Sequence, residues 1–210
     1  MLVSFLIPTR NRIESLIGGI QSITQKASSD VQLEILARVD EDDYVTLAAR
    51  NQIQAEIIVG PRWCGYNSAH LFFNEMAAKS HGDWIFPWND DIFMVTKKWD
   101  KLLPPASKST IIWITIPGSW TWAHPVMSRR LYDAWGCFSY GVPCDAWILN
   151  QWMAAGGVPD PNIVNSITVD HRRDEANILA NGIRTEDCVA PPASTAPKQK
   201  DFVKLLRDLM

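Results

Sequence analysis

The segment "DWIFPWNDDIFMV", residues 83–95, places two adjacent carboxylates inside an apolar run. Its first half is typical of a buried strand, and Asn89, Asp90 and Asp91 follow where that strand would end. Adjacent acids repel each other, and burying them is costly unless a positive charge lies close by. The segment therefore predicts either a solvated turn or a cation site at the end of a strand.

The rest of the chain alternates between strand and helix patterns. Strands are predicted at residues 2–8, 33–39, 55–60, 83–88, 110–117 and 165–173. Helices are predicted at residues 13–23, 67–81, 128–136 and 145–157. Asn11 is expected to be the N-cap of the first helix. This order predicts an α/β fold, with a mostly parallel central sheet and helices on both faces.

Composition narrows the class of protein. The chain has 210 residues and a net charge of −3. This near-even balance disfavours nucleic acid as a partner, although a local basic patch would still allow it. No apolar run reaches the ~20 residues of a membrane-spanning helix, and the start lacks signal-peptide features, so we expect a cytoplasmic protein. The four cysteines have no zinc-like spacing and are expected to be reduced thiols.

Polar residues gather where three predicted strands end. Residues 8–10 end the first strand, Asp40 ends the second, and residues 89–91 end the fourth. In an open parallel sheet, ligands bind beyond the carboxyl ends of the strands. Mg²⁺ and Mn²⁺ take carboxylate and phosphate oxygens, so an acid pair beside a phosphate-bearing ligand would suit them. Glu41 and Asp43, which follow Asp40, are expected to be solvated.

Together these segments resemble the family 2-like glycosyltransferases with the GT-A fold. "VSFLIPTRNR" is similar to that family's opening strand, and "HGDWIFPWNDD" is similar to its acidic segment, position for position from Gly82. The resemblance is good over residues 1–100 and looser over residues 110–175, and it is absent beyond about residue 185.

The resemblance implies one GT-A (Rossmann-like) domain over residues 1–188. Residues 1–100 would be its nucleotide-binding half and residues 101–188 its acceptor half. A Pro/Ala-rich linker over residues 189–200 and a short amphipathic helix over residues 201–210 follow. That helix is a candidate for association into a homo-oligomer.

The resemblance also implies roles for the strand-end residues. Pro8, Thr9 and Arg10 would line the nucleotide pocket, and Asp40 would accept a hydrogen bond from the base. Asp90 would face the ribose or the donor sugar.

The catalytic roles fall further along the chain. By the resemblance, Asp91 would be the main ligand of Mn²⁺ or Mg²⁺, with His171 as a further ligand. Arg172 would neutralise the leaving diphosphate. Asp145, at the start of a helix, would be the general base, since a helix N-terminus keeps a carboxylate ionised.

Three aromatic residues are expected on the acceptor or diphosphate side, namely Trp120, Trp122 and His124. Plainer interpretations stay open for several residues. Core packing is the default for tryptophan, and either histidine, His124 or His171, could be an ordinary core or surface residue. Asp145 could serve only as a helix N-cap.

The leading hypothesis is a metal-dependent glycosyltransferase that moves a sugar from a nucleotide-diphosphate sugar to an acceptor hydroxyl, with inversion and a carboxylate base. A UDP-sugar is the first candidate donor, and a glycan is one candidate acceptor. One alternative is a nucleotidyltransferase that makes nucleotide sugars, but "PTRNRIES" (8–15) lacks the glycines of its triphosphate loop. The other alternative is a non-catalytic module that binds nucleotides or sugars.

Overall fold

The computed structural model describes most of the chain. The described residues are 1–63, 68–106, 110–116, 122–141, 143–157, 167–172, 204 and 207. The side chains of Thr115, Trp122 and Ala123 lie outside this description.

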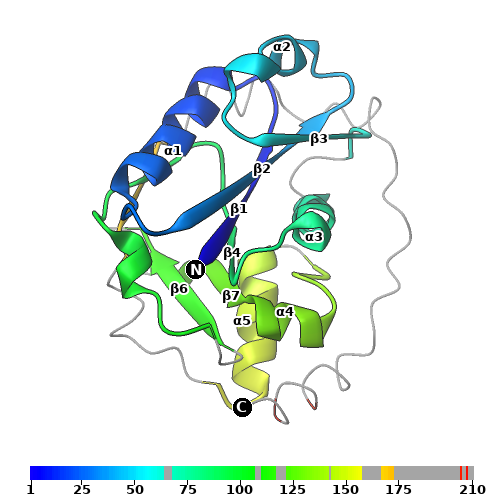
Figure 1. The fold of residues 1–210 in the computed structure, drawn as a ribbon. Coiled ribbons are helices and arrows are strands. Elements are labelled where there is room, and N and C mark those ends of the chain that lie inside the picture. Colours follow the sequence, from blue (N-terminus) through cyan, green and yellow to red (C-terminus); the bar gives the residue numbers. More distant parts are fainter. Residues whose placement is uncertain are drawn as a thin grey trace.

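A six-stranded sheet forms the centre of the molecule, in the order β3-β2-β1-β4-β7-β6 (Figure 1). Its strands are β1 (Leu2–Thr9), β2 (Gln32–Asp40), β3 (Glu56–Gly60), β4 (Trp84–Pro87), β6 (Ile111–Thr115) and β7 (Trp122–Ser128). The first four pair in parallel, whereas β7 is antiparallel to both of its neighbours. The predicted mostly parallel sheet is confirmed.

Helices cover both faces of the sheet, as predicted. They are α1 (Ile13–Lys26), α3 (Ala69–Lys79), α4 (Arg129–Trp135) and α5 (Cys144–Ala154). Alternate residues of a strand point to opposite faces. Phe5 of β1 belongs to the apolar cluster that includes α1, and Leu6 belongs to the cluster that includes α3, α4 and α5. Among the described residues, the buried tryptophans are Trp84, Trp88, Trp99, Trp113, Trp135 and Trp152, which agrees with the expected core role.

Several short elements were not predicted. They are α2 (Tyr44–Ala48), β5 (Ile92–Met94) and two 3₁₀ turns (Arg50–Gln52 and Trp99–Leu102). The strand β8 (Val169–His171) is shorter than predicted and pairs with β5 in a separate antiparallel ribbon.

The inner strand β7 was also missed, because it contains Pro125. Proline cannot donate to a strand ladder and occurs inside sheets mainly at bulges. Here the register of β6 against β7 shifts between Trp113 and Ile114, beside Pro125. His124 takes a left-handed backbone conformation there, with φ of 53°. An irregularity in the hydrogen-bond ladder between β6 and β7 therefore accommodates Pro125, a residue type that is disfavoured inside strands.

Two glycines of α1 allow the segment after β4 to lie directly on this helix. A Cβ at Gly19 would lie 3.2 Å from the carbonyl oxygen of Ile92 and 3.5 Å from that of Asp90. A Cβ at Gly18 would meet the ring edge of Phe93 at 2.9 Å. The absence of a side chain at Gly19, which faces backbone atoms, thus sets how closely the acidic segment packs on α1.

Arg207, in the C-terminal segment, contacts α5. Lys204 and Arg207 are helical, and Arg207 Nη2 donates a hydrogen bond to the carbonyl oxygen of Ala154 at 3.0 Å. The predicted linker lies outside the described residues, and association through this helix stays a prediction. Cys137 and Cys144 are free thiols, as expected, and burial raises the pKa of each to about 12.

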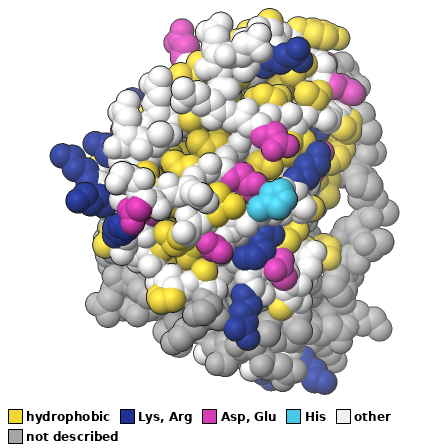
Figure 2. All heavy atoms as spheres, in the orientation of Figure 1, with side chains coloured by type: hydrophobic (Ala, Val, Ile, Leu, Met, Phe, Trp, Pro, Cys, Tyr) yellow, Lys and Arg dark blue, Asp and Glu magenta, His cyan; other side chains and the backbone are white. Residues whose placement is uncertain are grey.

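The surface carries both signs of charge. On the face drawn in Figure 2, acidic and basic side chains are interspersed over the described residues. Lys and Arg side chains gather at the left edge of this view, where an acidic side chain lies beside them. Among the described residues, no helix is both long enough and apolar enough to span a lipid bilayer.

Gly82, two residues before β4, provides a test of the packing. A Cβ there would lie 2.5 Å from the backbone nitrogen of Ser4. We expect Gly82→Ala to lower the free energy of unfolding by about 1–3 kcal/mol, the usual cost of overpacking. Gly18→Ala is the control, because a partly exposed Phe93 ring can move and alanine favours the helix. Urea denaturation measures both, and equal stability of the two variants would contradict the prediction.

Candidate active site

Asp90 and Asp91 lie at the carboxyl end of β4, and both are buried. Asp90 Oδ2 accepts a hydrogen bond from Thr9 Oγ1 at 2.7 Å, at the end of β1. The carbonyl oxygen of Asp90 accepts from Ser15 Oγ of α1 at 2.9 Å. The acid pair is therefore fixed against β1 and α1, and the solvated-turn alternative is wrong.

Arg12 supplies the positive charge that the buried acids require. Its Nη1 lies 2.7 Å from Asp90 Oδ1, and its Nη2 lies 3.3 Å from Asp91 Oδ2. One guanidinium therefore bridges both carboxylates. Sequence reasoning did not include Arg12 in the site. Two features of the sequence could have indicated its role. Arg12 lies three residues beyond the first strand, and the buried acid pair needs a nearby positive charge.

A left-handed turn at Asn11 directs Arg12 toward the acids. Asn11 has φ of 53°, and its N–H donates to Asp43 Oδ2 at 2.9 Å. The residue that precedes α1 as its N-cap is Arg12, so the prediction of Asn11 as N-cap was wrong. Asp43 was expected to be solvated but is buried, and it caps α2 by accepting from the N–H of Thr46. Glu41 is exposed, as expected.

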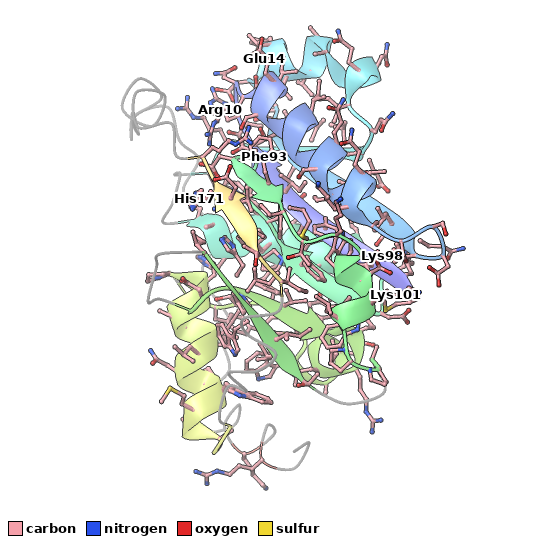
Figure 3. The ribbon with its side chains drawn as sticks, turned by 90° about the vertical axis from the view of Figure 1, so that its left-hand side faces the viewer. Arg10, Glu14, Phe93, Lys98, Lys101 and His171 are labelled. Atoms are coloured by element: carbon pink, nitrogen blue, oxygen red, sulfur yellow. The ribbon has the colours of Figure 1, made fainter. Side chains whose placement is uncertain are left out.

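His171 reaches Asp91 through the β5–β8 ribbon. It ends β8 and pairs with Ile92, which directly follows Asp91. His171 Nε2 lies 3.2 Å from Asp91 Oδ1, and the backbone N–H of Arg172 donates to the carbonyl oxygen of Asp91 at 2.9 Å. Figure 3 shows His171 beside the strand that carries Phe93. Two residues predicted as metal ligands are thus brought together from distant parts of the chain.

The two acids differ in their electrostatic environment. Burial raises the pKa of Asp90 to about 6, although Arg12 and the Thr9 hydroxyl oppose this rise. Burial also acts to raise the pKa of Asp91, but His171 and Arg12 outweigh it and hold that pKa below its usual value. Such a divergence in a buried pair is common at functional sites. Asp91 therefore loses its proton at a lower pH than Asp90 does.

Asp91 and His171 fit a divalent cation that also takes ligand oxygens. Asp91 Oδ1 is buried and makes no well-aligned hydrogen bond within the described part of the chain. Among the described residues, no group of three or more acids, histidines or cysteines could hold a metal alone. Mg²⁺-type sites commonly combine one or two protein ligands with substrate phosphates.

A second ionic cluster lies at the end of β2. Arg38 is 1% exposed, and its guanidinium carbon lies 5.0 Å from the ring centre of Trp63 and 4.9 Å from that of Phe72. Asp40 Oδ1 pairs with Arg38, and Asp40 Oδ2 lies 3.1 Å from Arg10 Nη1. A nucleotide base that bonded to Asp40 would share this carboxylate with two arginines.

The same cluster fixes Arg10. Its guanidinium also pairs with Asp42, which lies 3.4 Å from Arg62 Nη1. Burial raises the pKa of Asp40 despite both of its arginine partners. Pro8 lies in β1, directly beside Arg38 in the strand register. The predicted nucleotide-binding residues of strands one and two are thus neighbours, although their roles stay predictions.

His124 of β7 approaches the metal side of the site. Its ring centre lies 6.3 Å from that of His171 and 6.2 Å from that of Trp88. Burial lowers the pKa of His124 to about 4, and His171 adds to this effect. Its ring is therefore neutral at physiological pH. Trp122 lies in the same strand, without a described side chain, and Trp120 lies outside the described residues.

Asp145 and Arg172 lie nearer the surface. Asp145 is in the first turn of α5, whose N-cap position is Pro143, so the N-cap alternative for Asp145 is wrong. Helix α5 packs against β7. Among the described residues, no hydrogen bond or ion pair joins Asp145 to the acid pair. Arg172 pairs with Asp170 at 2.8 Å and lies 4.0 Å from the ring centre of Phe93.

No protein-family model and no curated protein matches the sequence, so the comparisons rest on solved structures. The mannosyltransferase PcManGT from Pyrobaculum calidifontis, in complex with GDP-Man and Mn²⁺, is similar with a TM-score of 0.60 and 13% identity. The match covers 99% of this chain and 69% of that chain.

Glucosyl-3-phosphoglycerate synthase from Mycobacterium tuberculosis is also similar. Its complex with Mn²⁺, UDP-Glc and phosphoglyceric acid has a TM-score of 0.58 and 13% identity, covering 91% of this chain and 81% of that chain. Its complex with Mg²⁺ and UDP has a TM-score of 0.56 and 15% identity. That match covers 91% of this chain and 80% of the synthase chain. At these identities the likeness establishes the fold, and the predicted GT-A (Rossmann-like) architecture is confirmed.

The hydrogen bond between Thr9 and Asp90 can be tested with a matched pair of variants. Thr9→Val keeps the shape but leaves a buried carboxylate oxygen without its donor. We expect the free energy of unfolding to fall by about 1–3 kcal/mol. Thr46→Val is the control, because Thr46 Oγ1 is buried and has no hydrogen-bond partner among the described residues. Chemical denaturation measures both, and a Thr9→Val variant as stable as the control would contradict this account.

Proposed function

We propose that this chain is a metal-dependent glycosyltransferase of the family 2 type, which transfers a sugar from a nucleotide-diphosphate sugar to an acceptor hydroxyl. The observation that carries the proposal is the pairing of an ionised Asp91 with His171, 3.2 Å apart at the carboxyl edge of a GT-A sheet. The similar solved structures, which contain nucleotide sugars with Mn²⁺, support it.

Asp91 and His171 would hold the divalent cation, which when bound would neutralise charge on the departing diphosphate. Thr9 and Arg12 hold the two carboxylate oxygens of the neighbouring Asp90 in place. The role expected for Asp90, facing the ribose or the donor sugar, stays a prediction. Arg172 is exposed beside this pair and can contribute further positive charge to the diphosphate.

The nucleoside would occupy the ends of β1 and β2. Asp40 and Arg10 offer an acceptor and donors for a base or ribose, and Arg38 holds Asp40 in place from the protein interior. A UDP-sugar is the first candidate donor, and a GDP-sugar is the next, because both kinds of nucleotide occur in the similar structures.

Asp145 would act as the general base. In the reaction, the acceptor oxygen forms a bond to the anomeric carbon, the bond from that carbon to the diphosphate breaks, and the acceptor proton passes to the Asp145 carboxylate. Attack opposite the leaving diphosphate gives inversion. No observation favours the nucleotidyltransferase alternative, because no glycine-rich loop follows β1.

Cation-dependent nucleotide binding is the first test. We expect UDP or GDP to raise the melting temperature in the presence of Mn²⁺ but not with a chelator. A bound ligand stabilises the folded protein in proportion to the logarithm of the ratio of ligand concentration to dissociation constant. Asp91→Asn should remove this effect, whereas Asp133→Asn, on the exposed face of α4, should retain it. Equal stabilisation by the nucleotide in chelator and in Mn²⁺ would contradict the proposal.

Asp145→Asn tests the base. This change keeps the size of the side chain but removes the proton acceptor, so nucleotide binding should stay intact while turnover falls by about 10²–10⁴-fold. The assay follows release of the nucleoside diphosphate from nucleotide sugars with a panel of hydroxyl acceptors. Turnover near that of the wild type would exclude Asp145 as the base. No release by the wild type with any donor would favour the binding-module alternative.

A further inference from the structure

The guanidinium of Arg12 occupies the carboxylates that the proposed function assigns to a cation and a donor. Its nitrogens lie 2.7 Å from Asp90 and 3.3–3.4 Å from Asp91, and its side chain is only 15% exposed. Charges interact more strongly when they are shielded from water. A divalent cation on Asp91 would therefore meet a nearby positive charge that already neutralises this acid.

The two contacts of Arg12 are unequal. The contact with Asp90 has the length of a strong charge-assisted hydrogen bond, whereas the contacts with Asp91 are about 0.5 Å longer than such bonds. The Arg12 backbone is fixed, because its carbonyl oxygen accepts from the N–H of Leu16 in the first turn of α1. Any exchange of partners therefore involves the side chain, and Asp91 is the partner held less tightly.

We propose that Arg12 is a built-in counter-ion that competes with the divalent cation for Asp91 and, once displaced, binds the donor diphosphate. This inference rests on the proposed function. Arg12 keeps its bond to Asp90 while Asp91 turns to the cation together with His171. The released Nη2 then donates to a diphosphate oxygen. The cation binds first and the nucleotide second, because a nucleotide alone meets a guanidinium that is already paired.

The proposal predicts opposite effects of one residue on two ligands. Arg12→Gln removes the competitor, so Mn²⁺ alone should bind about 5- to 150-fold tighter, the usual range for coupled sites. With saturating Mn²⁺, UDP and GDP should bind about tenfold weaker or more, because a charged hydrogen bond is lost. A residue with a purely structural role would not strengthen Mn²⁺ binding.

Electron paramagnetic resonance of free Mn²⁺ measures the first affinity, and calorimetric titration measures the second. Arg50→Gln is the matched control, because it removes the same charge from an exposed 3₁₀ turn. It should leave both affinities unchanged. The metal-free Arg12→Gln protein should also melt at a lower temperature, since two buried carboxylates lose their cation, and Mn²⁺ should restore part of that loss.

Unchanged or weaker Mn²⁺ binding by Arg12→Gln would overturn the inference, and so would unchanged nucleotide binding. If this variant does not fold, Arg12→Lys replaces it. Lysine keeps the charge but lacks the planar guanidinium group with which arginine bridges two carboxylates. Mn²⁺ should then bind tighter than to the wild type, and an unchanged affinity overturns the inference. Failure of the wild type and both variants to bind Mn²⁺ would also overturn the proposed function, whereas binding without any change on substitution contradicts this inference alone.

Discussion

The ion pairs between Arg12 and the buried acids Asp90 and Asp91 are the interaction on which the rest of the site depends. Two adjacent carboxylates inside a protein are tolerable only with a cation nearby, and the chain carries that cation at the start of α1. The same contacts fix the segment after β4 against α1, and this segment leads into β5. Since β5 pairs with β8, the position of His171 also follows from them.

The fold places two clusters of charge along the carboxyl edge of one sheet. One is built on β4 and β8 and has the chemistry of a divalent-cation site. The other is built on β2, where the buried Arg38 holds Asp40 and, through it, Arg10. A nucleoside diphosphate is an elongated ligand with a base at one end and negative charge at the other, so it matches two adjacent clusters of this kind. This correspondence links the architecture to the proposed transfer of a sugar.

Local sequence patterns predicted most of the architecture. Apolar runs and helical periodicity depend on near neighbours, so the main strands and helices of the first half were predicted correctly. Features that depend on distant partners were not. Arg12 needed both the left-handed turn at Asn11 and acids far along the chain. Strand β7 was not predicted, because it contains Pro125, which fits into the sheet only where the hydrogen-bond ladder is irregular. His171 was predicted through family resemblance, because no periodicity links it to Asp91.

The most direct test of the account is a crystal structure of the protein with Mn²⁺ and UDP or GDP, in which manganese is located by its anomalous scattering. We expect an anomalous peak at coordination distance from the Asp91 carboxylate and His171 Nε2, with diphosphate oxygens completing the ligand set and the nucleoside extending toward Asp40. A nucleotide bound at another edge of the sheet, or a diphosphate bound here without manganese at Asp91, would contradict it.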